Sequence, residues 1–404
     1  MKKKYLPIIL IMLLSFGLHL FFLVEHPGFF DKYGSRDAGE YDKMAQRLVY
    51  DGYYGYNADQ PNAYVTPSHP IYLAGNILLA DFLHIDHLFL VKISNMILNM
   101  LALFALYLTA KMLFKNEWMA CLTALLYGTY LAPLHFFRSL LTESPAINFF
   151  IFSIFCYVLA VKKNQWRYHV LFGIIASITL MFRPTPAPIL LLVWLILIFQ
   201  FGWKKAIQIG FIWCVGPLIV MLPWVIRNYI QFQHAFLFSS HSGNPLLGGT
   251  NPFFLEDFDG ILARLNELGI TDKEYAIRRI KNGFTENFPL WFSWFTVGKF
   301  AVMFHQAEPI GNYYNFFSPM VKKLINFQHL LIVVGAFAFG FIYHKNRSIL
   351  VLLIIILIYI GLSNLFIPVG RYGAFIIPVM CLVVSYGIVT SVEMLVGKLR
   401  FKRA

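Results

Sequence analysis

Charged residues are scarce in this sequence: Asp, Glu, Lys and Arg make up 13% of the 404 residues, whereas 58% are hydrophobic. Soluble domains carry about 25% charged residues. This scarcity excludes a water-soluble globular fold and indicates a lipid environment. The net charge of +13 does not indicate nucleic-acid binding, because the basic residues stand in small groups between apolar runs and form no basic patch.

Cysteine is also scarce, and familiar catalytic motifs are missing. The four cysteines each stand alone inside an apolar run: Cys121, Cys156, Cys214 and Cys381. Without paired spacing they predict neither a disulfide framework nor a zinc site, and we interpret them as buried small hydrophobic residues. The sequence contains no GxxxxGK[ST], GxSxG or HExxH motif, so a phosphate loop, a serine-hydrolase elbow and a zinc protease helix are not indicated.

Long apolar runs are what the sequence has in abundance. A membrane-spanning helix needs about 20 apolar residues, and lipid tolerates no open sheet edges. We therefore predict about ten helical spans, at residues 5–24, 87–112, 118–136, 143–161, 167–182, 184–200, 205–226, 325–343, 348–367 and 372–396. The first follows three lysines and precedes no small-residue cleavage signature, which predicts an uncleaved span.

The orientation of the chain depends on residues 70–83, an apolar segment too short for a clear span. If it crossed, Lys162, Lys163, Lys204 and Lys205 would all face outside, against the positive-inside rule. We therefore predict a helix lying at the interface, with both termini of this multi-pass cell-membrane protein in the cytoplasm. The predicted organisation is a first span (1–24), a first outer region (25–86), transmembrane helices 2–7 (87–226), a second outer region (227–324), and C-terminal transmembrane helices with a cytoplasmic tail (325–404).

The acidic residues gather in the two outer regions. Fifteen of the 20 acidic residues lie in residues 25–69 and 227–324. A chain that avoids charge elsewhere has thus concentrated its carboxylates on one face of the membrane, and an active site is expected on this extracytoplasmic face.

The first outer region holds several candidate site residues. Asp37 and Glu40 lie one turn apart in a predicted short amphipathic surface helix; a carboxylate at a helix start is also a common N-cap. Tyr64 and His69 follow in a stretch rich in tyrosine and proline. These residues fit an interfacial aromatic belt and fit a sugar site equally well.

Several charged residues lie at the outer ends of predicted spans. Glu143 opens one span just after Arg138, and a charge at this depth is a functional candidate by default. Arginines at other outer ends are Arg183, Arg227 and Arg371, the last followed by Tyr372. Each arginine alone fits a snorkelling anchor. Together, against a positive-inside background, they fit the phosphate of an anionic lipid, because arginine binds phosphate bidentately.

The second outer region contributes Lys299 and Glu308 as further candidates. An ion pair between them is the simpler alternative to ligand binding. The apolar, aromatic segment 291–304 predicts a surface helix or half of a re-entrant pair.

The order of these motifs resembles the GT-C glycosyltransferases, in particular bacterial relatives of the protein O-mannosyltransferases and the aminoarabinose transferase. The motifs that carry the resemblance are Asp37-Ala38-x-x-Tyr41-x-x-x-Ala45, the Tyr-Gly stretch 53–56, Glu143 at a span start, Arg183-Pro184, Pro223-Trp224-x-x-Arg227-Asn228-Tyr229, and Arg371-Tyr372. It implies an all-α polytopic bundle of about ten transmembrane helices with two extracytoplasmic regions carrying short helices.

The resemblance also implies an activity. Such enzymes transfer a sugar from a polyprenyl-phosphate donor on the outer side of the membrane, and the family's usual catalytic residue in the first loop corresponds to Asp37. A carboxylate there fits a general base on the acceptor hydroxyl. No cofactor is implied with certainty; family members differ in their need for a divalent metal, so metal use is left open. The acceptor, a protein, lipid or glycan, is open too.

Two departures from the family pattern bear on this expectation. His69 stands where many relatives have tyrosine before the proline. The sequence also continues only briefly after its tenth predicted span, without the soluble C-terminal domain of some relatives, so acceptor recognition is expected from residues 227–324 or from a partner.

Two other functions are kept as alternatives. A transporter or flippase of a lipid-linked cell-envelope precursor also needs outer arginines, but it needs polar groups deep in the bundle or on both faces. The predicted spans hold few such groups, and the carboxylates lie outside. A non-catalytic assembly partner would not need Asp37.

Overall fold

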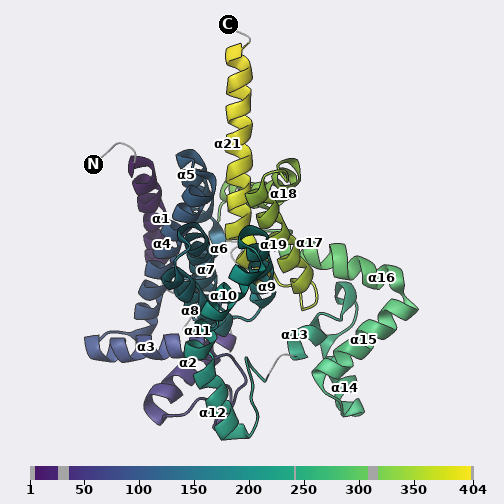
Figure 1. Ribbon diagram of the computed structural model, residues 1–404. Coiled ribbons are helices and arrows are strands. Elements are labelled where there is room, and N and C mark those ends of the chain that lie inside the picture. The colour runs from purple at the N-terminus through teal and green to yellow at the C-terminus, as the bar shows by residue number, and fades with distance from the viewer. Residues whose placement is uncertain (1–4, 26–35, 241–242, 308–316, 402–404) are drawn as a thin grey trace.

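The computed structural model describes residues 5–25, 36–240, 243–307 and 317–401, and within these ranges the chain is helical without a β-strand (Figure 1). The predicted spans are carried by α1 (Leu6–Glu25), α4 (His87–Phe114), α5 (Glu117–Gly128), α6 (Leu131–Phe136), α7 (Glu143–Lys163), α8 (Trp166–Phe182), α9 (Ala187–Phe201), α10 (Trp203–Trp213), α11 (Val215–Val220), α12 (Leu222–Phe232), α18 (Pro319–Ile342), α19 (Arg347–Ser363), α20 (Gly370–Gly373), η6 (Ala374–Ile376) and α21 (Ile377–Phe401). The remaining elements are α2 (Arg36–Gln46), η2 (Arg47–Asp51), α3 (Ser68–Leu83), α13 (Gly243–Gly248), η3 (Pro252–Phe254), α14 (Phe258–Leu268), α15 (Asp272–Glu286), α16 (Phe288–Ser293), η4 (Trp294–Gly298) and α17 (Lys299–Phe304).

The described part of the chain contains six helical segments long and apolar enough to cross a membrane. They are Leu6–Val24, His87–Phe114, Glu143–Lys163, Trp203–Val220, Pro319–Ile342 and Gly370–Val396. Shorter apolar helices are Trp166–Phe182, Ala187–Phe201, Phe288–Phe304 and Arg347–Ser363. The prediction of an all-α, multi-pass membrane protein is thus confirmed, whereas the count of ten spans stays a prediction.

Two of the predicted spans are broken helices. Residues 118–136 form α5 and α6, separated at Thr129 and Tyr130. Residues 205–226 are divided among α10, α11 and α12, and Pro223 stands in the first turn of α12, where its missing N–H is tolerated. Gly216 lets α11 approach α8 closely, since a Cβ there would lie 2.0 Å from the carbonyl oxygen of Gly173.

The core lies around α21, the long helix that rises through the bundle in Figure 1. Residues 373–385 are buried on every side of the helix, which is typical of a helix apolar all round. Its neighbours include α5, α18 and α19. Arg371 lies in α20, which leads through the short η6 into α21. The position of Arg371 is therefore tied to the most buried part of the molecule.

A buried polar network centred on Asn99 of α4 joins the N-terminal helices. The Asn99 Nδ2 donates to the Pro133 carbonyl at 2.9 Å and lies 3.1 Å from His19 Nε2 of α1. The Asn99 Oδ1 accepts from Asn148 Nδ2 of α7 at 2.6 Å and from Ser144 Oγ at 3.4 Å. Polar side chains inside an apolar bundle hold helices together in this way.

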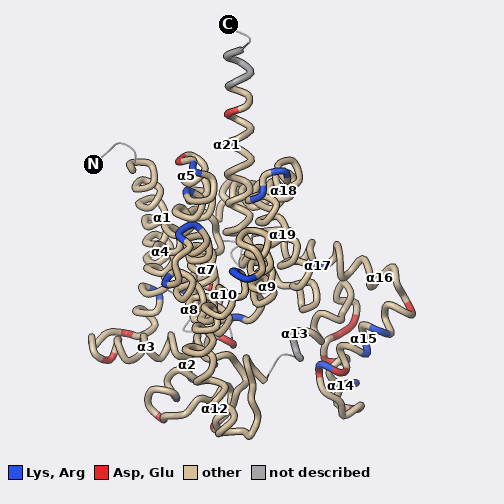
Figure 2. The backbone as a smooth tube through the Cα atoms, in the orientation of Figure 1, with Lys and Arg blue, Asp and Glu red and all other residues tan. Residues whose placement is uncertain are grey.

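The outer-region elements gather at one end of the bundle. Figure 1 shows α3 lying crosswise to α4, which it contacts, and α13–α17 form a separate lobe beside the bundle. That α3 lies at the membrane interface stays a prediction. Figure 2 shows most acidic positions in red on these elements. Within the lobe, Arg279 holds Glu256 at 2.5 Å, and this pairing lowers the pKa of Glu256.

The Asn99 network gives a stability prediction. We expect Asn99→Ala to lower the free energy of unfolding by about 1–2 kcal/mol, because several buried hydrogen bonds are lost at once. Thermal unfolding in detergent measures the effect, with the exposed Asn266→Ala as control. Equal melting temperatures for the two variants would show that the network does not hold the bundle.

Candidate functional site

Four charged side chains from four separate segments meet at the outer-region end of the bundle. The Arg183 Nη2 lies 2.6 Å from Glu143 Oε1, and Arg371 Nε lies 3.5 Å from the same oxygen. The Arg371 Nη2 in turn lies 3.7 Å from Asp37 Oδ2. The result is a chain of alternating charge, Arg183–Glu143–Arg371–Asp37, which we call the charge chain.

Exposure differs along the charge chain. The side chains of Arg183 and Glu143 are 15% and 1% exposed, whereas those of Arg371 and Asp37 are 31% and 50% exposed. A buried carboxylate must be paired, because an unpaired charge inside a protein costs several kcal/mol. The pair Glu143–Arg183 is thus the buried part of the charge chain, and Asp37 is the end that a substrate can reach.

Local sequence explains how the buried end is built. Glu143 lies in the first turn of α7, where the helix dipole favours negative charge. Arg183 follows α8 in an extended conformation, as expected for a residue before proline. Thr142 is the N-cap residue of α7, but its hydroxyl makes no capping hydrogen bond and instead accepts one from Arg183 Nε at 2.9 Å.

Tyrosines surround the charge chain. The Tyr372 ring lies under both guanidinium groups, 5.1 Å from Arg183 Cζ and 5.7 Å from Arg371 Cζ, within cation–π range. The Tyr56 hydroxyl donates to Asp37 Oδ1 at 3.4 Å, and the Tyr64 ring stacks on Tyr56 at 5.1 Å. Burial, followed by the nearby Asp37 charge, raises the pKa of Tyr56 above its usual range, so that its hydroxyl stays a proton donor.

His69 packs against Tyr41, one of the tyrosines near the charge chain. Its Nε2 donates to the Leu140 carbonyl at 2.7 Å, and its ring meets the Tyr41 ring edge-to-face at 4.8 Å. Burial lowers the pKa of His69 to about 4, so the ring is neutral at physiological pH. The Tyr41 ring in turn packs against the Tyr56 ring at 5.4 Å, so His69 supports Tyr56 through Tyr41.

The structure does not bring all predicted candidates to the charge chain. Arg138 Nη1 donates to the Phe22 carbonyl at 2.8 Å, and Arg227 Nη1 donates to the Asn62 carbonyl at 2.9 Å. Glu40 pairs with Lys43 on its own helix. Lys299 donates to the Asn364 carbonyl at 2.7 Å rather than to a carboxylate. Glu308 lies outside the described residues.

The sequence did not single out Tyr56, Tyr41 or Thr142 as site residues. Tyr56 stands in the Tyr-Gly stretch and Tyr41 on the apolar face of the Asp37 helix, so both belonged to recognised patterns. Their contacts with Asp37 and His69 depend on how the first outer region folds over α7 and α8. That fold could not be inferred from spacing alone.

Among the described residues, the carboxylates of the site form no group suited to hold a divalent metal. Within the described ranges, no group of three or more His, Cys, Asp and Glu side chains could hold an ion. The two carboxylates of the charge chain are engaged by arginines, whereas Mg²⁺ and Ca²⁺ prefer sets of free oxygen ligands.

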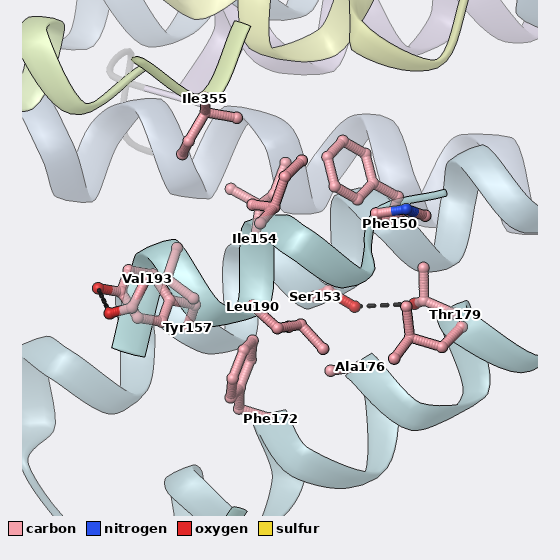
Figure 3. Close-up of a pocket in the computed structure, with 13 residues that line it drawn as sticks. Phe150, Ser153, Ile154, Tyr157, Phe172, Ala176, Thr179, Leu190, Val193 and Ile355 are labelled. Carbon is pink, nitrogen blue, oxygen red and sulfur yellow. Dashed lines mark hydrogen bonds between the residues drawn. The ribbon is translucent and has the colours of Figure 1, made fainter. Parts of the chain in front are cut away.

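An apolar cavity lies within the helix bundle. Figure 3 shows it between α7, α8 and α9, lined by residues including Phe150, Tyr157, Phe172, Leu190 and Val193. Leu180 and Pro186, on either side of Arg183, also line it. A second, more open groove lies between α9 and α19, with Leu191 and Leu195 on one side and Ile358 on the other. Apolar space therefore flanks α9 just beyond Arg183.

The fold and the site together define a class of protein: a polytopic helical bundle with outer regions folded over a charged cluster at one membrane face. The archaeal oligosaccharyltransferase AglB from Archaeoglobus fulgidus, solved with an inhibitory peptide and a dolichol-phosphate, matches with a TM-score of 0.59 at 13% identity over 99% of this chain and 52% of that one. Another AglB structure, tethered with an acceptor peptide, gives a TM-score of 0.59 at 14% identity over 97% and 50%. The chain therefore spans about half the length of AglB and shares the fold of its matching part.

The remaining comparisons are with a sequence-family model, a further solved structure and curated proteins. A family model described as dolichyl-phosphate-mannose-protein mannosyltransferase matches residues 68–226. ArnT from Cupriavidus metallidurans, bound to undecaprenyl phosphate, matches at 11% identity over 94% of this chain and 77% of that one, with a TM-score of 0.44. A search of curated proteins gives no match. The partial match to the mannosyltransferase family model and the fold shared with AglB confirm the resemblance to GT-C glycosyltransferases that the sequence predicts.

We expect Arg183 and Arg371 to contribute differently to the stability of the folded protein. We expect Arg183→Gln to lower the melting temperature clearly, because the closest partner of the buried Glu143 is lost. Arg371→Gln, which removes a longer and more exposed contact with Glu143, should lower the melting temperature much less. Thermal unfolding of both variants checks this order, and the reverse order would contradict the assignment of Glu143–Arg183 as the structural pair.

His69 gives a pH prediction. Its pKa is about 4 in the folded protein against 6.5 for a free side chain, so between these values the unfolded chain binds the extra proton. Stability is therefore complete above pH 6.5 and falls as the pH drops toward 4, by at most about 1.4 kcal/mol per pH unit. Melting curves from pH 7 to 4 should show a smaller loss for His69→Gln; an identical loss would remove His69 as a source of acid sensitivity.

Proposed function

We propose that this protein transfers a sugar from a polyprenyl-phosphate donor to an acceptor on the extracytoplasmic side of the membrane. The observation that carries the proposal is the half-exposed Asp37 at the open end of the charge chain, set in a GT-C-like fold that contains an apolar cavity. The reaction needs a base, a phosphate site and space for a lipid chain. Asp37 would supply the base, the arginines of the charge chain the phosphate site, and the apolar cavity the space.

The donor phosphate is assigned to Arg371 and Arg183. Arginine forms paired, charge-assisted hydrogen bonds with phosphate oxygens. Arg371 is suited to this role because its contact with Asp37 is long, at 3.7 Å, and its side chain is partly exposed. The prenyl chain is assigned to the apolar space flanking α9, whose lining includes Leu180 and Pro186, three residues to either side of Arg183 in the sequence.

Asp37 is assigned as the general base. It takes the proton from the acceptor hydroxyl while the acceptor oxygen bonds to C1 of the sugar. The bond between C1 and the phosphate oxygen breaks, and its electron pair leaves with the polyprenyl phosphate. The arginines stabilise the charge that develops on the leaving group, and no covalent enzyme intermediate is needed.

The extracytoplasmic placement is supported by charge. The basic pair Lys162–Lys163 stands at the opposite end of α7 from Glu143, and Lys204–Lys205 follow the end of α9 that is farther from Arg183 in the sequence, as the positive-inside rule expects for cytoplasmic loops. Both termini lie at the end of the bundle away from α2 and α12 (Figure 1). The acceptor, whether protein, lipid or glycan, is assigned to the side of the charge chain on which Asp37 is exposed.

The catalytic assignment is tested by Asp37→Asn. We expect this variant to fold and insert normally and to lose at least 10³-fold in transfer rate, because the amide cannot accept the proton. The measurement uses proteoliposomes supplied with lipid-linked sugars extracted from the source membranes, with product detected by mass spectrometry.

The matched control is Asp59→Asn, which removes an almost fully exposed carboxylate of the same region. Its transfer rate should equal that of the wild type. Full activity in purified Asp37→Asn protein would overturn the assignment, and movement of the intact lipid-linked sugar across the bilayer without transfer would favour the flippase alternative.

A further inference from the structure

The turn that carries Arg371 is held between the two ends of α17 in the second outer region. At the start of α17, Lys299 Nζ donates to the carbonyl of Asn364, which precedes the turn, at 2.7 Å. At its end, Met303 lies against Gly373, two residues beyond Arg371: a Cβ at Gly373 would lie 2.9 Å from the Met303 carbonyl oxygen. Lys299 and Met303 are one helical turn apart, so one face of α17 brackets the turn.

Further hydrogen bonds join the same two segments. Asn364 Nδ2 donates to the Phe295 carbonyl at 3.0 Å. The Ile367 N–H donates to the Pro245 carbonyl at 2.8 Å. We call these two bonds and the Lys299–Asn364 bond the clasp. Through the clasp, the second outer region fixes residues 364–367, from which the chain continues directly to Arg371.

Lys299 is an unusual residue to find in such a contact. Its side chain is completely buried, and its ammonium lies 3.7 Å from the centre of the Phe295 ring. Burying an ammonium group costs several kcal/mol unless its surroundings compensate, and a carbonyl oxygen and an aromatic face compensate only in part. Burial lowers the pKa of Lys299 to about 7, and the amine can donate to the Asn364 carbonyl in either protonation state. An apolar side chain would avoid the cost of burial, so the buried amine points to a role in holding this carbonyl.

We propose that Lys299 is a positioning residue that acts through the clasp to hold Arg371 where it binds the donor phosphate. This inference rests on the phosphate role of Arg371 proposed above. In this role Lys299 connects the α13–α17 lobe to the donor site in the helix bundle. Lys299 itself does not touch the donor.

The first test is Lys299→Met, which keeps the length of the side chain and removes the donor. Amide hydrogen exchange in residues 364–373 should become at least tenfold faster, and binding of undecaprenyl phosphate in nanodiscs should weaken about tenfold. The exposed Lys281→Met in the same lobe should change neither. Unchanged exchange and binding in a folded Lys299→Met protein would overturn the proposal. Asn364→Leu, which removes only the amide bonds, is the second variant and should shift both readouts in the same direction.

The second test restores the clasp covalently. A Cβ at Gly248 would lie 3.3 Å from that of Ile367, close to the separation of about 3.5–4.5 Å found in disulfides. The pair Gly248→Cys and Ile367→Cys is therefore introduced in a background where the exposed Cys214 is serine. Oxidation of this pair should return undecaprenyl phosphate binding of the Lys299→Met protein to near the wild-type value, and dithiothreitol should abolish the rescue.

The outcomes separate the inference from the proposed function. If the disulfide forms without restoring binding, Lys299 does not act through the clasp and the proposal is wrong. If the wild-type protein itself fails to bind undecaprenyl phosphate, the donor assignment falls. In that case, faster exchange in Lys299→Met still shows that Lys299 holds the Arg371 turn.

Discussion

The buried carboxylate of Glu143 is the interaction on which the rest of the site depends. It receives Arg183 from the turn after α8 and Arg371 from the turn before α21, so one side chain fixes three segments of the bundle. A carboxylate left without these partners would be a costly buried charge. Its pairing therefore specifies how α7, α8 and α21 meet, and that geometry leaves Arg371 extended toward Asp37.

Composition made the membrane bundle predictable. Apolar runs of span length must be helical in lipid, and most predicted spans coincide with apolar helices in the structure. The breaks at Thr129 and within residues 213–222 were not predictable, because they depend on close packing such as that of Gly216 on Gly173 rather than on the hydropathy of the segment.

The sequence also allowed the members of the charge chain to be predicted, but not their partners. Asp37, Glu143, Arg183 and Arg371 stood out because charge at the membrane face is rare and expensive. The same reasoning selected Arg138 and Arg227, whose guanidinium groups instead bind backbone carbonyls. Separating an arginine that binds a ligand from one that satisfies the backbone requires the tertiary structure. The contact of Tyr56 with Asp37 and the burial of Lys299 have the same origin, since each joins segments far apart in the sequence.

The central claim is that the charge chain opens at Arg371 to receive a lipid phosphate beside Asp37. A cryo-EM structure of the protein in nanodiscs containing undecaprenyl phosphate tests it most directly. The account predicts the phosphate within hydrogen-bonding distance of Arg371, Arg371 moved away from Asp37, and Glu143 still paired with Arg183. A phosphate bound elsewhere, with the contact between Arg371 and Asp37 intact, would contradict it.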